Sequence, residues 1–373
     1  MPILLLHALL HLYVGLRLGS ELPVWGAVLL GLLLTASALL IPLSFFARRL
    51  GLRIGEGVSW GGLLAMGLFS SLFVLTLLRE ATLLAVWAAE RLGTGTWPQW
   101  DERSAVAVIA GALLMSAWGF LNARRTARVR QVELPVADLP AGLAGFRIAQ
   151  ISDVHVGPTI RRGQIDRIVA AVNRLQADMV AVTGDLVDGS VRDLAIHVAP
   201  LAGLQARHGV FFVTGNHEYY SGAPAWIAEL RRLGMTVLMN EHVVLDHGGA
   251  RLVVAGVADW SAHHFEPSHR SDPKAALAGA PPSTPRVLLA HQPRSAEAAA
   301  QAGFDVQLSG HTHGGQFWPW VHFVRFQQPF TAGLHRLRQL VVYVSRGTGY
   351  WGPPKRFGAP SEITLLRLVP GRG

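Results

Sequence analysis

Two patterns of hydrophobic residues divide this chain. In the first third, apolar residues run almost without interruption through residues 3–18, 24–46, 58–78 and 105–121. Each run approaches the roughly 17–25 residues that a helix needs to cross a bilayer. We therefore predict a region of four transmembrane helices over residues 1–121. No basic segment precedes Ile3 and no small-residue cleavage site follows the first run, so we expect a retained helix and no signal peptide.

Two features of this region stay open. Residues 81–92 are apolar on one side, are too short for a span and end in Glu90-Arg91, so they predict an interfacial helix or an extension of the third span. His7 and His11 lie four residues apart on one face of the first helix. That placement suits helix packing, an interfacial position or an intramembrane function.

Beyond residue 145 the apolar runs become short and rich in β-branched residues. They predict buried strands at residues 146–151, 179–182, 210–213, 287–290, 306–308, 341–344 and 363–369. Amphipathic segments at residues 164–175, 225–233 and 295–302 predict helices between these strands. Gly248 and Gly249 predict the turn of a hairpin. This alternation is typical of an α/β domain, here over residues 146–373, after a linker and first strand at residues 122–145. Residues 275–285 predict an exposed loop.

Composition and charge support a membrane protein with a basic second part. Half of the residues are hydrophobic and the mean hydropathy is +0.32. Of the formal net charge of +9, residues 1–121 contribute only seven Arg against six acidic residues. Arginines follow the second and fourth predicted spans (Arg48, Arg49 and Arg53; Arg124, Arg125, Arg128 and Arg130), so the positive-inside rule places the second part in the cytoplasm. A basic domain beside a membrane suits lipid headgroups and phosphorylated substrates, and the chain has no recognised nucleic-acid module.

Five polar fragments follow strands or small-residue turns of the second part. They are Asp153-x-His155, Gly184-Asp185-x-x-Asp188, Gly215-Asn216-His217-Glu218, His291 and Gly310-His311-Thr312-His313. Carboxylate and amide oxygens, neutral imidazoles and one bridging acid are what two adjacent divalent cations need. The chain has no Cys, which excludes a thiolate nucleophile, and it has no Gly-x-Ser-x-Gly elbow. The sequence therefore predicts a metal-dependent phosphoesterase. The absence of Cys fits a reducing compartment without proving one.

The ordered set of fragments resembles the calcineurin-like metallophosphoesterase superfamily, from about Phe146 to the C-terminus. The extended forms Gly-Asn-His-Glu-Tyr and Ser-Gly-His-Thr-His-Gly-Gly-Gln resemble its membrane-anchored bacterial subgroup. The resemblance implies a four-layer fold, with two mixed sheets packed together and flanked by helices. It also implies a hydrolase that uses two divalent metal ions of the kind Mn, Fe or Zn.

The resemblance assigns a role to each matching residue. It implies Asp153, His155 and His313 on one metal, Asn216, His291 and His311 on the other, and Asp185 between the two. It implies that His217 is a catalytic residue that faces the reacting phosphoryl group. Asp188 and Glu218 match positions that orient ligands, although the family usually has Asp where Glu218 stands.

Three functions are compatible with these features. The first is a membrane-anchored phosphoesterase that hydrolyses a lipid-linked or nucleotide-linked phosphoester or diphosphate, such as a cell-envelope precursor. The second is a phosphomonoesterase or cyclic-nucleotide phosphodiesterase on a soluble substrate. The third is a membrane sensor or transporter with a regulatory metal-binding domain. The complete set of ligand residues favours an enzyme. The sequence leaves the natural substrate, the native metal and the oligomeric state open.

Overall fold

A computed structural model describes residues 2–49 and 55–371 of the chain, without the side chains of residues 45–49. Arg53 and the side chains of Arg48 and Arg49, on which part of the predicted orientation rests, lie outside the described residues. The chain forms two compact units. One comprises Met1–Arg124 and Gly352–Phe357, and the other comprises Arg125–Trp351 and Gly358–Gly373. The first unit thus includes a six-residue segment that the sequence assigned to the catalytic domain.

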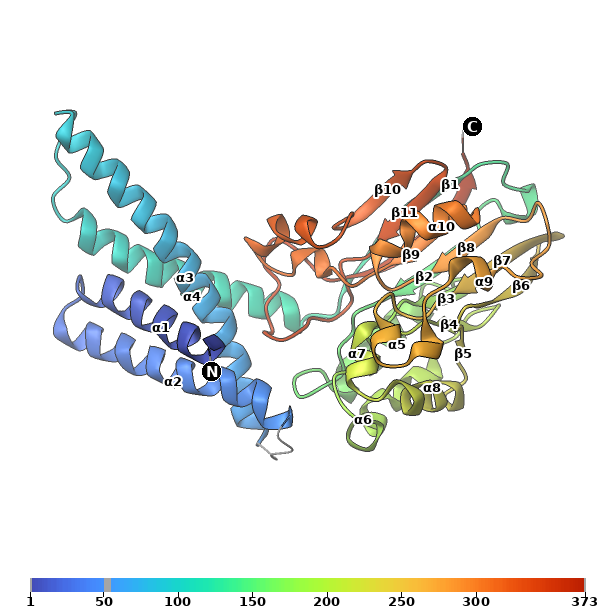
Figure 1. Ribbon diagram of the computed structural model, residues 1–373, viewed down its shortest axis with the longest axis horizontal. Helices are drawn as coiled ribbons and strands as arrows, with labels where there is room; N and C mark the ends of the chain where they lie inside the picture. The colour runs from blue at the N-terminus through green and yellow to red at the C-terminus, as the bar shows by residue number, and fades with distance from the viewer. Residues whose placement is uncertain (1, 50–54, 372–373) are drawn as a thin grey trace. The chain divides into compact units, whose positions relative to one another are not determined.

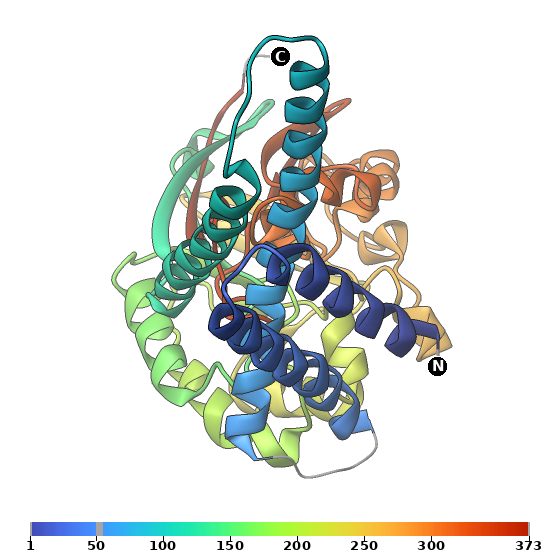
Figure 2. The same ribbon diagram turned by 90° about the vertical axis from the view of Figure 1, so that its left-hand side faces the viewer.

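The first unit is built on four neighbouring helices, shown in blue to teal in Figure 2. They are α1 (Pro2–Gly19), α2 (Val24–Arg49), α3 (Glu56–Arg91) and α4 (Trp100–Arg124). All four are long and apolar enough to cross a membrane. The 36 residues of α3 exceed the ~20 that cross a bilayer, because residues 81–91 continue the third helix without a break. The second of the two predictions for this stretch therefore holds.

Polar side chains inside the first unit tie its helices together. Arg79 of α3 is buried, and its guanidinium donates to Ser104 Oγ at 2.9 Å, Asp101 O at 3.0 Å and Arg17 O at 3.1 Å. The ring of His11 stacks on Phe69 at 3.6 Å, and its Nε2 lies 3.0 Å from Ser37 Oγ. These contacts of His11 are helix packing, which is one of the three roles left open for His7 and His11.

The second unit contains two six-stranded mixed sheets (Figure 1). The first sheet has the order β1-β12-β2-β3-β4-β5, with β1 (Arg128–Val136), β12 (Glu362–Pro370), β2 (Arg147–Ile151), β3 (Met179–Val182), β4 (Val210–Phe212) and β5 (Thr236–Val237). The second sheet has the order β10-β11-β9-β8-β7-β6, with β10 (Gly333–Leu337), β11 (Leu340–Val344), β9 (Val306–Ser309), β8 (Arg286–Leu289), β7 (Ala250–Gly256) and β6 (Glu241–His247). Residues of both sheets, such as Ile148 and Val254, share one buried core.

Helices flank the two sheets, which confirms the predicted four-layer α/β fold (Figure 1). They are α5 (Arg162–Asn173), α6 (Val191–Val198), α7 (Asn216–Tyr220), α8 (Ala223–Arg232), α9 (Pro273–Ala276) and α10 (Ala296–Ala302). Ala276 of α9 and Ala299 of α10 are fully buried against the second sheet. The predicted loop at residues 275–285 therefore begins inside a short covering helix. In the hairpin β6–β7, His247 pairs with Ala250, and the two glycines between them take positive φ, as the turn requires.

Candidate metal centre

Parallel strands bring the predicted ligands to one edge of each sheet. The residues that follow strand ends in this way are Asp153 and His155 after β2, Asp185 after β3, Asn216 after β4, His291 after β8, and His311 and His313 after β9. Because β2, β3 and β4 are parallel, and so are β8 and β9, the carboxyl ends of the strands of each sheet lie together. The side chains of the two sets then meet in three groups of potential ligands.

The first group joins Asp153, His155 and His313. Nε2 of His155 lies 3.0 Å from Nε2 of His313, and Nε2 of His313 lies 3.5 Å from Asp153 Oδ1. Two imidazole nitrogens that face each other next to a carboxylate are arranged as ligands of one cation are.

The second group joins Asp185, His291 and His311. His291 Nε2 lies 3.1 Å from Asp185 Oδ2 and 3.2 Å from His311 Nδ1. Nδ1 of His291 lies 2.8 Å from the carbonyl oxygen of Thr183, which leaves Nε2 directed at the group. Oδ2 of Asp185 is also 3.9 Å from His155 Nε2, so this carboxylate lies between the two groups.

The third group joins His155, Asp185 and His217, and two carboxylates hold His217 in place. Its Nδ1 lies 2.6 Å from Asp188 Oδ1, and its backbone N–H donates to Asp185 Oδ1 at 2.8 Å. The same Asp188 oxygen lies 3.1 Å from His155 Nδ1. Burial alone would lower the pKa of His217, but the charges of Asp185 and Asp188 raise it to about 9. The contact of Nδ1 with Asp188 leaves Nε2 as the ring atom that can donate a proton to a substrate.

Glu218 binds backbone and not side-chain groups. Its carboxylate accepts from the N–H groups of Gly215 at 2.6 Å, Leu186 at 2.7 Å and Asp185 at 3.0 Å. Burial and the charge of Asp185 raise the pKa of Glu218 to about 8. Glu218 thus ties the loop after β3 to the start of α7, which fits the orienting position that the resemblance gave it.

Two features of the backbone shape the site. Five potential ligands have a left-handed backbone, namely Asp153 (φ 53°), His155 (φ 55°), Asp185 (φ 52°), His311 (φ 71°) and His313 (φ 51°). Each such residue costs roughly 1–3 kcal/mol and persists only where its surroundings enforce it. A side chain at Gly215 or Gly310 would collide with Asp185 or Asp153, respectively. The glycines of two motifs are therefore required by close packing around the carboxylates.

Comparison with known proteins agrees with this geometry. A family model described as calcineurin-like phosphoesterase matches residues 146–315. A transmembrane protein with metallophosphoesterase domain from Bos taurus is 40% identical over 312 residues, which is 80% of this chain and 70% of that protein. This chain belongs to the calcineurin-like metallophosphoesterase family. An uncharacterized metallophosphoesterase from Helicobacter pylori is 39% identical over 69% of this chain and 69% of that protein. Among solved structures, a dimetal phosphatase from Danio rerio aligns with 60% of this chain and 99% of that chain, at 14% identity and a TM-score of 0.38.

The chain is therefore a hydrolase of the metallophosphoesterase type, associated with a membrane through its apolar helices. The family uses a dinuclear divalent metal centre, and the residues of this chain fit one. Asn216 Oδ1 is buried and has no hydrogen-bond partner among the described residues. A buried amide oxygen without a donor is costly unless a cation or water binds it. The ligand types, mixed nitrogen and oxygen, suit several transition metals.

One further buried carboxylate near the centre was missed from the sequence. Asp259 follows β7, accepts from Gln292 Nε2 at 3.0 and 3.1 Å, and faces the charge of His291. Burial raises the pKa of Asp259. Its position just beyond the end of β7 is the signal that could have identified it from the sequence.

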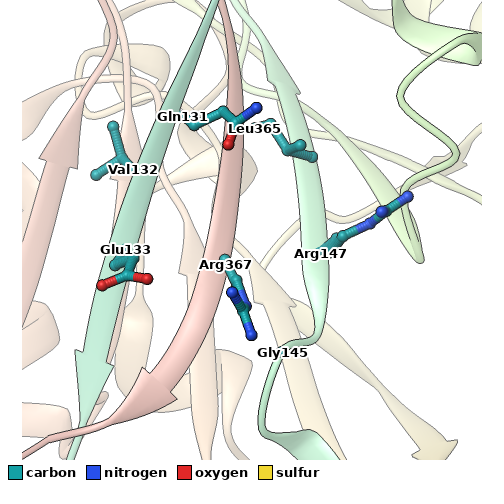
Figure 3. A pocket seen from close by; sticks show the side chains of 7 residues that line it. All are labelled: Gln131, Val132, Glu133, Gly145, Arg147, Leu365 and Arg367. Carbon is teal, nitrogen blue, oxygen red and sulfur yellow. The ribbon is translucent and has the colours of Figure 1, made fainter.

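A surface groove of about 620 Å³ lies apart from these groups (Figure 3). It is lined by residues of β1, β2 and β12 and by Gly145, with Arg147, Arg367 and Glu133 as its charged members. No potential metal ligand lines it, so the groove is not the place of the phosphoester chemistry.

Proposed function

We propose that this metallophosphoesterase hydrolyses a phosphoester or diphosphate bond of a lipid-linked substrate. In this proposal, Asp153, His155 and His313 would hold one ion, Asn216, His291 and His311 would hold the other, and Asp185 would be shared. The chemistry that divalent cations would supply here is an activated water and compensation of the charge that builds on the phosphoryl oxygens.

The other residues of the site act on the substrate or on the ligands. His217, protonated and held by Asp188, donates a hydrogen bond or a proton to the leaving oxygen. Asp188 fixes the rings of His155 and His217 together, because one of its oxygens contacts both. Glu218 holds the backbone of the loop that carries Asp185. No protein nucleophile is needed.

An exposed aromatic segment supports the choice of a lipid-linked substrate. Soon after His313, two short 3₁₀ turns, Trp320–His322 and Val324–Phe326, expose Trp320 (42%), Phe323 (52%) and Phe326 (74%). The guanidinium of Arg325 lies 5.3 Å from the centre of the Phe326 ring. Exposed aromatic rings beside a cation suit the headgroup layer of a bilayer. A segment of this kind, close in sequence to a potential metal ligand, would bring the site to membrane-bound substrates.

The test compares a lipid phosphodiester with its water-soluble headgroup in mixed micelles, using the metal-loaded full chain. We expect a higher kcat/KM for the lipid, because each buried methylene contributes about 0.8 kcal/mol. Replacement of Trp320, Phe323 and Phe326 by Ser should remove most of this preference. Ile196→Ser, which changes an exposed apolar residue of α6, is the matched control. Equal efficiency on both compounds would favour the soluble phosphomonoester or cyclic nucleotide instead.

We propose the cytoplasmic side for the catalytic unit. The support is the cluster of arginines at and just beyond the end of α4, which includes Arg124, Arg125 and Arg128, set against the mixed charges of the α3–α4 connection. Single cysteines at Gly95 and Ser190 in this Cys-free chain test the assignment. An impermeant thiol reagent added to intact cells should label Gly95→Cys and spare Ser190→Cys, and the reverse pattern would contradict it.

A further inference from the structure

Exposed aromatic rings gather beside His217 in the catalytic unit. Tyr220, at the end of α7, is 61% exposed, and its ring centroid lies 5.1 Å from that of His217. Trp351 is 42% exposed, and its ring lies 5.9 Å from the same imidazole and roughly perpendicular to it. Phe265, 48% exposed, adds a third ring 5.5 Å from Tyr220. All of these residues belong to one compact unit, and together they leave apolar surface open beside the proposed acid.

The geometry of α7 separates the roles of its two tyrosines. Tyr219 is buried in a small hydrophobic cluster, and its hydroxyl lies 2.9 Å from His269 Nδ1. Successive side chains of a helix point about 100° apart. Tyr220 therefore leaves the core where Tyr219 enters it. Tyr219 stabilises the fold, whereas Tyr220 presents its ring to a substrate.

Trp351 is held by the last residue of the motif Gly-His-Thr-His-Gly-Gly-Gln. This residue, Gln316, is buried, and its Nε2 donates to Trp351 O at 2.8 Å. Its Oε1 accepts from Trp351 N, also at 2.8 Å. Two hydrogen bonds with one side-chain amide fix the backbone of Trp351. Because Gln316 follows the potential ligand His313 by three positions, the Trp351 ring is held close to the metal centre.

The exposed apolar surface beside His217 is aromatic and not aliphatic. The large exposed aliphatic side chains that the structure describes in this unit lie outside the loops of the potential ligands, namely Val129 on β1, Ile196 on α6, Val244 on β6 and Leu334 on β10. Exposed apolar residues that gather at one place mark a binding site, whereas scattered ones do not. An aromatic side chain offers its face to another flat ring, and this stacking needs no particular pattern of hydrogen bonds.

We propose that Tyr220 and Trp351 form a subsite for a leaving group that contains a flat aromatic ring. This inference rests on the proposed function, with His217 as the proton donor. The leaving oxygen must lie within hydrogen-bond reach of His217 Nε2, so the group attached to it meets the rings that flank the imidazole. Hydrolysis adds an OH group from water to phosphorus, breaks the bond between phosphorus and the leaving oxygen, and places a proton from His217 on that oxygen. The ring-bearing alcohol leaves, and the lipid part of the substrate stays on the phosphoryl product.

The test compares two phosphodiesters that differ only in the leaving group. Methyl β-naphthyl phosphate carries a flat ring, and methyl hexafluoroisopropyl phosphate carries none. The two leaving alcohols have similar acidity, so the intrinsic reactivities of the esters are nearly matched. Both esters are offered to the full chain, loaded with Mn²⁺ in detergent. We expect kcat/KM to be higher for the naphthyl ester by about 5- to 100-fold, the range that stacking of a flat ring on one aromatic side chain gives.

Substitutions assign the preference to the two rings. Tyr220→Ser and Trp351→Ser should each lower the ratio of the two kcat/KM values by about 5-fold or more, whereas Tyr220→Phe keeps the ring and should keep the ratio. Both side chains are exposed, so these changes leave the core intact, and Ile196→Ser on α6 is the matched control for loss of exposed apolar surface. Equal efficiency of the wild-type chain on both esters, or an unchanged ratio in either Ser variant, would overturn the inference and leave the proposed function standing. A wild-type chain that hydrolyses neither ester would overturn the proposed function, and this inference with it.

Discussion

The two units of this protein differ in how their buried charged groups are paired. In the helical unit, two buried cations are matched to partners: Arg79 donates to three oxygens of α1 and α4, and Lys355 donates to three oxygens of α3 and α4. His7 Nε2 of α1 is the exception there, because it is buried without a partner among the described residues. In the catalytic unit, nitrogens and oxygens of like kind face each other. His155 and His313 meet through their Nε2 atoms, and Asn216 Oδ1 has no partner among the described residues.

The backbone shows the same difference. Among the described residues, the non-glycine positions with positive φ include none in α1, α2, α3 or α4, but they include five potential metal ligands. Strain and unmatched polar atoms both lower stability, so they persist where function selects them. A buried charge in the helices therefore contributes to the stability of the fold, whereas a buried charge in the metal centre contributes to metal binding and hydrolysis. Substitutions in the two units should therefore have opposite consequences.

The largest effect is expected from Asp185→Asn. Asparagine tolerates the left-handed backbone at this position and has the same shape, so the substitution removes mainly the charge. Because Asp185 belongs to the second group and lies 3.9 Å from His155 of the first, we expect the loss of at least one metal equivalent. Hydrolysis should fall by more than about 10³-fold, as the loss of several kcal/mol of charge stabilisation implies. Metal analysis and kcat measure both, with the exposed Asp166→Asn of α5 as control. Two tightly bound ions with full activity would contradict the shared ligand.

A smaller effect, confined to kcat, is expected from His217→Ala. The imidazole contacts Asp188, and we propose that it acts as an acid and does not bind a metal ion. We therefore expect kcat to fall by about 10²–10⁴-fold while two metal equivalents remain bound. Parallel loss of metal and activity would make His217 a ligand.

The sequence predicted the fold of the catalytic unit well, because its signals are local. The run at residues 179–182 became β3 with the same bounds, and the two glycines after His247 formed the expected hairpin turn. The polar residues after strand ends were found for the same reason, since motif and strand are adjacent in sequence. The structure brings these residues together, while their individual roles stay predictions.

What the sequence did not reveal depends on contacts between distant residues. Lys355 meets Gly67 across 288 positions, and no local pattern links a loop glycine to a helix glycine. Asp259 lies in the loop that follows β7, and neither of the two histidines farther along that loop, His263 and His264, belongs to a group of potential ligands among the described residues. The left-handed backbone of the ligands was also invisible, because Asp and His do not signal positive φ as glycine does.

The smallest effect is expected in the helical unit and concerns Arg17 of α1 and Arg79 of α3. Arg79 is buried and donates to three oxygens of α1 and α4, whereas Arg17 forms an exposed ion pair with Glu80 at 2.6 Å. Arg79→Leu removes three hydrogen bonds from a charged donor, each of which contributes about 1.5–3 kcal/mol at most, although Asp101 O keeps the donor Ser104 Oγ. Arg17→Leu removes an exposed ion pair, which contributes about 0–1 kcal/mol.

We therefore expect Arg79→Leu to lower the free energy of unfolding, measured by SDS titration in mixed micelles, clearly more than Arg17→Leu does. Both variants should keep the wild-type metal content, because neither arginine belongs to the catalytic unit. Equal losses of stability would show that the hydrogen bonds of buried Arg79 stabilise the helical unit no more than an exposed ion pair does. Loss of metal in Arg79→Leu would show that a substitution in the helical unit also disturbs the metal centre.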